Sequence, residues 1–121
     1  MTSRPTVLVC DDEPNLRELI RVSLGDGYVF VEATDGEQAL DLARRLRPDL
    51  VVLDLMMPRR NGLEILAELR RDALLAGTPV VVVTAQPAAQ DEARANGADG
   101  VVVKPFNPDE LADLAASLVT A

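Results

Sequence analysis

Apolar residues along the chain gather in five short runs, and between these runs they recur at every third or fourth position. Each run is almost continuously apolar and rich in β-branched side chains, which is typical of strands covered on both faces. The pattern therefore predicts buried strands over residues 6–10, 28–31, 50–53, 79–84 and 101–103.

The stretches between the runs have helical spacing. In the first stretch Pro14 suits the first turn, a glycine follows the last turn, and four apolar residues fall on one face: Leu16, Leu19, Ile20 and Leu24. Similar spacing predicts helices over residues 36–46, 63–75, 87–96 and 108–119. Strand and helix thus alternate, which predicts an α/β fold with a parallel sheet, helices on both faces and right-handed crossovers.

Polar side chains stand where the predicted strands end, and this is the edge at which α/β sheets bind ligands. They are Asp11, Asp12 and Glu13 after the first strand, Asp54 after the third, Thr84 at the end of the fourth, and Lys104 after the fifth. Each has an ordinary explanation when taken alone, since acids ahead of a proline can cap a helix and a lysine can be a solvated surface residue. Their placement after four strands of one repeat favours a shared site.

Carboxylates gathered at this edge call for a cation, because like charges repel and an unpaired buried charge is costly. Mg²⁺ prefers oxygen ligands and is usually held by one or two carboxylates together with water and phosphate oxygens. We therefore expect Mg²⁺ and Lys104 to balance Asp54. Given a phosphoryl donor, Asp54 could act as a carboxylate nucleophile while Thr84 donates a hydrogen bond to the transferred group, and the product would be an aspartyl phosphate.

The composition excludes several classes of function. The chain has 121 residues, enough for one domain, and its formal net charge of -8 argues against nucleic acid and anionic membranes as partners. It contains no histidine, which excludes hydrolases with an imidazole base and the usual zinc sites. Cys10 is the one cysteine, so no intramolecular disulfide can form.

The chain shows no sign of membrane insertion. Its first residues lack the features of a signal peptide, and its apolar runs are too short to span a bilayer, so we expect a cytoplasmic protein. Arginines near helix ends and after Asp54 are expected to be solvated side chains, those near helix ends complementing the helix dipoles: Arg44, Arg45, Arg47, Arg59, Arg60, Arg70 and Arg71.

Four segments carry a resemblance to a known family. "VLVCDDEPNLRELI", "PDLVVLDLMMPRRNGLEIL", "PVVVVTA" and "GADGVVVKPF" resemble, in this order, blocks of the receiver domain of bacterial two-component response regulators. The resemblance covers nearly the whole chain. It implies a flavodoxin-like (βα)5 fold with strand order 2-1-3-4-5, a single receiver domain over residues 1–121 without an output domain, and phosphorylation by a sensor histidine kinase or histidine phosphotransfer protein.

The resemblance also implies a role for each site residue. Asp54 is implied to be the phosphoacceptor, and Mg²⁺ is implied to bind Asp12, Asp54 and the backbone carbonyl of Met56, with Asp11 reaching the ion through water. The implied contacts of the phosphoryl oxygens are Thr84, Lys104 and the backbone N–H of Ala85. The Lys104–Pro105 peptide is implied to be cis. The donor histidine would lie on another protein, in keeping with its absence here.

The chain departs from the family pattern in the region that usually reports phosphorylation. Receivers usually carry a Tyr or Phe three residues before the lysine, and this chain has Val101 there. Only 19 residues separate Thr84 from Lys104, fewer than is usual in receivers, so the fourth helix or the loop before it is expected to be short. Apolar Met56 could shield an acyl phosphate from water or simply fill a gap.

The leading interpretation is a Mg²⁺-dependent phosphoacceptor switch, monomeric or weakly dimeric, without enzymatic activity beyond its own phosphorylation and dephosphorylation. It would contact a downstream protein through the fourth helix, the fifth strand and the fifth helix. The main alternative is a constitutive interaction module that has lost the response to phosphorylation. A phosphohydrolase is disfavoured, because such enzymes resemble a D-x-D arrangement and the residue two positions after Asp54 is Met56. An FMN-binding flavodoxin is disfavoured because it needs a phosphate cradle where this chain has "DDEP".

Overall fold

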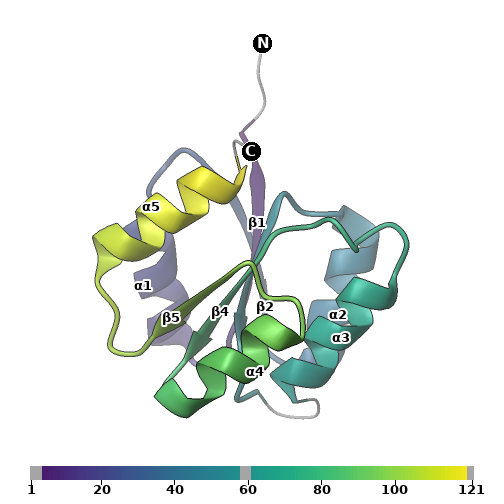
Figure 1. The fold of residues 1–121 in the computed structure, drawn as a ribbon. Coiled ribbons are helices and arrows are strands. Elements are labelled where there is room, and N and C mark those ends of the chain that lie inside the picture. Colours follow the sequence, from purple (N-terminus) through teal and green to yellow (C-terminus); the bar gives the residue numbers. More distant parts are fainter. Residues whose placement is uncertain (1–3, 58–60, 120–121) are drawn as a thin grey trace.

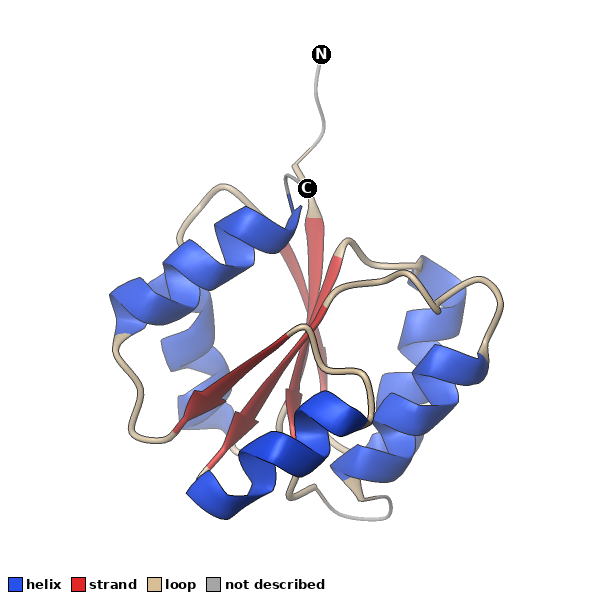
Figure 2. Cartoon of the chain, viewed as in Figure 1, coloured by secondary structure: helices blue, strands red, loops and turns tan. Residues whose placement is uncertain are grey.

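The five predicted strands form one parallel sheet in the order β2-β1-β3-β4-β5, as expected. The computed structural model describes residues 4–57 and 61–119. Figures 1 and 2 show the strands at the centre and the helices around them. The elements are β1 (Thr6–Cys10), α1 (Pro14–Leu24), β2 (Val29–Ala33), α2 (Gly36–Leu46), β3 (Leu50–Asp54), α3 (Gly62–Arg71), β4 (Val80–Thr84), the 3-10 turn η1 (Pro87–Ala89), α4 (Gln90–Ala95), β5 (Gly100–Val103) and α5 (Pro108–Val119).

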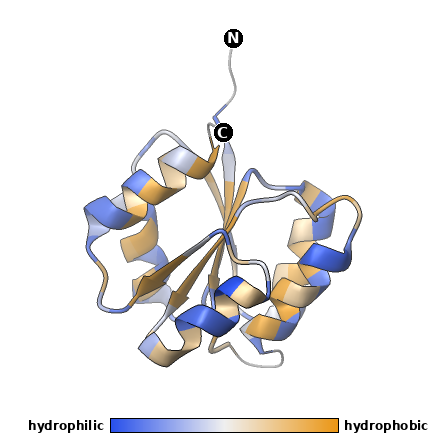
Figure 3. Cartoon of the chain, viewed as in Figure 1, coloured by the Kyte–Doolittle hydropathy of each residue, from blue (hydrophilic) through white to orange (hydrophobic). Residues whose placement is uncertain are grey.

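The helices cover both faces of the sheet. Helices α1 and α5 pack together on one face, and α2, α3 and α4 lie on the other (Figure 1). Side chains of one strand alternate between the two layers, so that Val7 and Val9 face α1 and α5 while Leu8 and Cys10 face the other helices. This double coverage explains why β1, β3, β4 and β5 are almost continuously apolar, and Figure 3 shows the hydrophobic sheet inside more polar helices. The prediction that the second strand is buried is only partly right, because β2 lies at the edge of the sheet, carries Glu32 and buries only Ala33 fully.

Several element boundaries differ from those predicted. The second strand is Val29–Ala33 instead of residues 28–31. It extends further because its pairing with β1 continues beyond the polar Glu32, to Ala33 opposite Cys10. The third helix ends at Arg71 instead of residue 75. Leu75 is nonetheless buried, because turns after Asp72 fold it back onto the core.

The segment between β4 and β5 is short, as expected. It forms the 3-10 turn Pro87–Ala89 followed by the α-helix Gln90–Ala95, where the spacing predicted one helix over residues 87–96. Gly97 follows this segment with a φ of 105°. No helix in the described part of the chain is long and apolar enough to cross a bilayer.

The expectation that Arg70 is a solvated helix-end residue is wrong. Its guanidinium donates two hydrogen bonds to the carbonyl of Gly97, at 2.9 and 2.7 Å, and one to the carbonyl of Thr78 at 2.7 Å. It also pairs with Asp99 at 2.8 Å. Arg70 therefore ties the end of α3 to the loops before β4 and β5. Arg59 and Arg60 lie outside the described residues.

Candidate functional site

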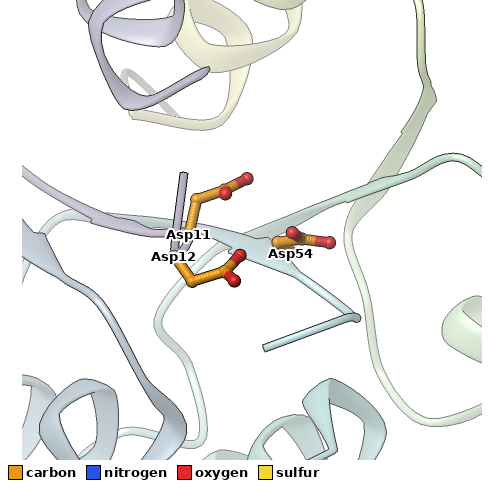
Figure 4. A group of neighbouring side chains, drawn as sticks. All are labelled: Asp11, Asp12 and Asp54. Carbon is orange, nitrogen blue, oxygen red and sulfur yellow. The ribbon is translucent and has the colours of Figure 1, made fainter. Parts of the chain in front are cut away.

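Three carboxylates meet at the carboxyl ends of β1 and β3. Asp11 and Asp12 directly follow β1, and Asp54 is the last residue of β3. One oxygen from each lies within 4.8 Å of the others, and Figure 4 shows the three side chains together. Asp11 and Asp54 are buried, with 1% and 4% of their surface exposed, whereas Asp12 is exposed. The predicted acidic cluster is therefore present, with one side open to solvent.

Asp54 is held by contacts on both of its carboxylate oxygens. The Met56 N–H donates a hydrogen bond to Oδ1 at 3.0 Å, and Lys104 Nζ lies 3.4 Å from Oδ2. The adjoining helix α3 approaches closely because its first residue is glycine: a Cβ at Gly62 would lie 2.5 Å from Leu55 Cα and 2.9 Å from the Asp54 carbonyl oxygen. Asp54 is thus fixed at a tightly packed strand end.

Asp11 carries the one buried side-chain polar atom without a hydrogen bond in the described part of the chain, its Oδ2. Its other oxygen accepts a hydrogen bond from the Glu13 N–H at 2.9 Å, and Lys104 Nζ lies 3.6 Å from Oδ2. Burial raises the pKa of Asp11 to about 6, and the charge of Asp54 adds to the rise while the Glu13 N–H and Lys104 oppose it.

These features fit a hard divalent cation. Three carboxylates face one ammonium group, so the cluster has an excess of negative charge, and an orphaned buried oxygen can be satisfied by a metal ion or its water. Carboxylate oxygens with one side open to solvent are the donors that Mg²⁺ prefers. The residues that could hold it are Asp11, Asp12 and Asp54, whose carboxylate oxygens lie close together.

Thr84 and Lys104 complete the site from β4 and β5. Thr84 is buried at the end of β4, one residue beyond the pair formed by Asp54 and Val83. Its Oγ1 accepts a hydrogen bond from the Gln86 N–H at 3.0 Å, which leaves the hydroxyl proton free to be donated. Lys104, the only lysine in the sequence, follows β5, and the Lys104–Pro105 peptide is cis, as the resemblance implied. Ala85 is exposed beside Thr84.

Val101 is buried in the layer of α2, α3 and α4, opposite Val82 of β4. The chain has three aromatic residues, and all of them pack in the opposite layer, with α1 and α5: Tyr28, Phe30 and Phe106. No ring therefore takes the place of the missing aromatic residue on the Val101 side of the sheet.

Sequence reasoning missed an ion-pair cluster beside the site. Arg17 and Arg21, one turn apart on α1, both bind the carboxylate of Glu32 on β2. Arg17 also donates a hydrogen bond to the backbone carbonyl of Asp11 at 2.8 Å. The only signal in the sequence is the spacing of two arginines by four residues, which is ordinary for an exposed helix face.

Comparisons with known proteins agree on one family. The response regulator receiver domain matches residues 7–116 of this chain. The DNA-binding response regulator MtrA of Mycolicibacterium smegmatis is 44% identical over 113 residues, which are 91% of this chain and 48% of MtrA. The chain thus spans about half the length of the curated relatives it matches.

Solved structures of similar length give the same result. The chemotaxis response regulator CheY4 of Vibrio cholerae has a TM-score of 0.87 at 33% identity, covering 96% of this chain and 99% of CheY4. The receiver domain of the Francisella response regulator 1452 has a TM-score of 0.88 at 32% identity, covering 97% of this chain and 98% of that domain. With the acidic cluster, Thr84 and Lys104 at one edge of a 2-1-3-4-5 sheet, the chain belongs to the response regulator receiver domain family.

Proposed function

We propose that this receiver domain is a phosphoacceptor switch in which Asp54 accepts a phosphoryl group from a histidine of a partner kinase or phosphotransfer protein. The observation that carries the proposal is the buried Asp54 carboxylate, which lies beside two further carboxylates and the ammonium group of Lys104. Such an arrangement suits charge neutralisation during phosphoryl transfer.

In the proposed reaction an Asp54 carboxylate oxygen forms a bond to phosphorus, and the phosphorus–nitrogen bond of the donor phosphohistidine breaks. The bonding electron pair leaves with the imidazole nitrogen. The departing ring is neutral imidazole when its other nitrogen carries a proton. Lys104 balances charge on the phosphoryl oxygens, and the Thr84 hydroxyl and Ala85 N–H donate hydrogen bonds to them. Asp54 is held in place by the Met56 N–H.

Asp12, Asp54 and the Met56 carbonyl would bind Mg²⁺ directly, and Asp11 would do so through water. The bound ion would supply electrostatic stabilisation of the transferring group. The orphaned Asp11 oxygen supports this assignment, because it is a buried acceptor in need of a donor.

The switch would act on a protein partner through α4, β5 and α5. The net charge of -8 supports a protein rather than nucleic acid as the direct contact of this domain. The description of MtrA as DNA-binding applies to a protein about twice as long as this chain.

A second candidate is a constitutive interaction module that can bind Mg²⁺ without changing its surface. Buried Val101 and the six-residue α4 favour it, because Val101 offers no ring that could move inward. The intact set of Asp11, Asp12, Asp54, Thr84 and Lys104 favours the switch.

The test is the intact mass after incubation with Mg²⁺ and acetyl phosphate, for the native chain and for Asp54→Asn. The proposal expects one added phosphoryl group on the native chain and none on the variant. Absence of any gain in folded protein that binds Mg²⁺ would favour the constitutive module. Amide NMR shifts near residues 84–103 that change on phosphorylation would separate the switch from a module that is phosphorylated without a response.

A further inference from the structure

The Arg17 guanidinium joins the ion-pair cluster to the acidic site. Its Nε donates to Glu32 Oε1 at 2.6 Å, and one terminal nitrogen donates to the Asp11 carbonyl at 2.8 Å. Its side chain is only 13% exposed, so solvent screens these contacts weakly. Arg17 therefore links the first turns of α1, the end of β2 and the loop that follows β1.

The Asp11 carbonyl belongs to the peptide unit between Asp11 and Asp12. Because a peptide unit is planar, fixing its carbonyl also fixes the direction of the Asp12 N–H and the point from which the Asp12 side chain departs. Asp11 is held independently by the hydrogen bond from Glu13 to its carboxylate. Asp12 is exposed, and the contact of Arg17 acts on the backbone just ahead of it.

Glu32 holds the guanidinium in the orientation that this contact requires. The position of Glu32 is set by the pairing of β2 with β1. Val9 pairs with Glu32, and the Asp11 N–H donates a hydrogen bond to the Ala33 carbonyl at 3.1 Å. Arg21 binds the second oxygen of Glu32. Arg17 is thus anchored on one side by the sheet and on the other by its own helix.

We propose that Arg17 is a positioning residue for the cation site: by holding the Asp11–Asp12 peptide, it sets the relative orientation of the two carboxylates that meet Asp54. This inference rests on the proposed function in so far as the cation is Mg²⁺. Groups that orient metal ligands from outside the coordination shell typically contribute about 10- to 100-fold in affinity.

The direction in which Mg²⁺ affinity changes when Arg17 is replaced distinguishes positioning from simple electrostatics. Arg17 is a cation close to a cation site, so removing its charge alone would strengthen Mg²⁺ binding. Loss of positioning would weaken binding instead. Arg21 provides a matched control. It carries the same charge as Arg17 and lies one turn further along α1, and its contact in this cluster is with the Glu32 carboxylate.

The experiment measures Mg²⁺ affinity by calorimetry for the native chain, Arg17→Met and Arg21→Met. We expect about tenfold weaker binding for Arg17→Met and a change within about twofold for Arg21→Met. In the Mg²⁺-free proteins, NMR should show a shifted Asp11 carbonyl carbon and Asp12 amide for Arg17→Met only. Equal or tighter Mg²⁺ binding by Arg17→Met would overturn the inference, as would equal weakening in both variants.

Arg17→Lys keeps the charge and covers the case in which Arg17→Met does not fold. An ammonium group lacks the planar fork that reaches carboxylate and carbonyl together, so we expect severalfold weaker Mg²⁺ binding. Native affinity in Arg17→Lys would overturn the inference. If the native chain bound no Mg²⁺, the metal part of the proposed function would fail together with this inference. If the native chain bound Mg²⁺ and the Arg17 variants matched it, only this inference would fail.

Discussion

Lys104 Nζ lies 3.4 Å from Asp54 Oδ2, although the two residues are 50 positions apart in the chain. The same ammonium group lies 3.6 Å from Asp11 Oδ2, so it faces both buried carboxylates. It is only 24% exposed and is the one lysine available to balance them. The charge of the site therefore depends strongly on this side chain.

Lys104→Met should change Mg²⁺ binding and phosphorylation in opposite directions. Removing a positive charge should tighten Mg²⁺ binding severalfold, because less charge repels the ion. Phosphorylation of Asp54 by acetyl phosphate should slow by about 100-fold, because a preorganised cation no longer stabilises the phosphoryl oxygens. Calorimetry and intact mass against time measure the two effects. A fall in both would indicate general damage to the site rather than loss of charge.

Gly62→Ala should destabilise the fold by about 1–3 kcal/mol, because the new Cβ would meet backbone atoms of Asp54 and Leu55 that cannot move aside. Urea denaturation measures the free energy of unfolding. The matched control is Gly77→Ala, where a Cβ would meet no atom within 4 Å and should change stability by no more than about 1 kcal/mol. Equal effects at the two positions would contradict the close packing of α3 against Asp54 and Leu55.

The Cys10 thiol should be unreactive in the folded protein. It is 1% exposed, and burial together with the neighbouring charge of Asp11 raises its pKa above the ordinary range. We expect reaction with a thiol reagent to be slow in buffer and fast in urea, with a rate that follows the unfolded fraction. Rapid modification of folded protein would show that β1 opens locally beside the acidic site.

Arg70→Met should lower the free energy of unfolding by about 1–3 kcal/mol, because it leaves the Gly97 and Thr78 carbonyls without their donor. Amide exchange around residues 96–99 should accelerate more than exchange in α1. Arg71→Met, an exposed neighbour on the same helix, is the control and should change stability by about 0.5 kcal/mol or less. Similar losses for both variants would contradict the role of Arg70 in tying the loops together.

The sequence predicted the sheet and the acidic site because both follow from periodicity. Continuous apolar runs identified the strands, and the rule that parallel strands present their carboxyl ends at one edge brought Asp11, Asp54 and Lys104 together. Neither step needed the positions of individual side chains.

Arg17, Arg70 and the end of α3 depend on tertiary contacts that the sequence does not encode locally. Arg17 meets Glu32 only because β2 pairs with β1 in one register. Arg70 looked like a solvated residue because its acceptors are carbonyls 8 and 27 positions away. Leu75 kept the helical spacing yet lies in a turn, since burial rather than helix formation determines where an apolar side chain falls.

The single lysine, Lys104, also offers one site at which the acidic cluster can be probed by chemical modification. Every other basic side chain is an arginine, so Lys104 is the one side-chain amine that acylating reagents can modify, and mass spectrometry of peptides separates it from any reaction at the α-amino group. The rate of that reaction would report directly on the acidic site, because a group bound to Asp54 or a change of charge at Asp11 would alter access to the amine. Site occupancy could thus be followed in the native sequence without a substitution that introduces a reactive residue.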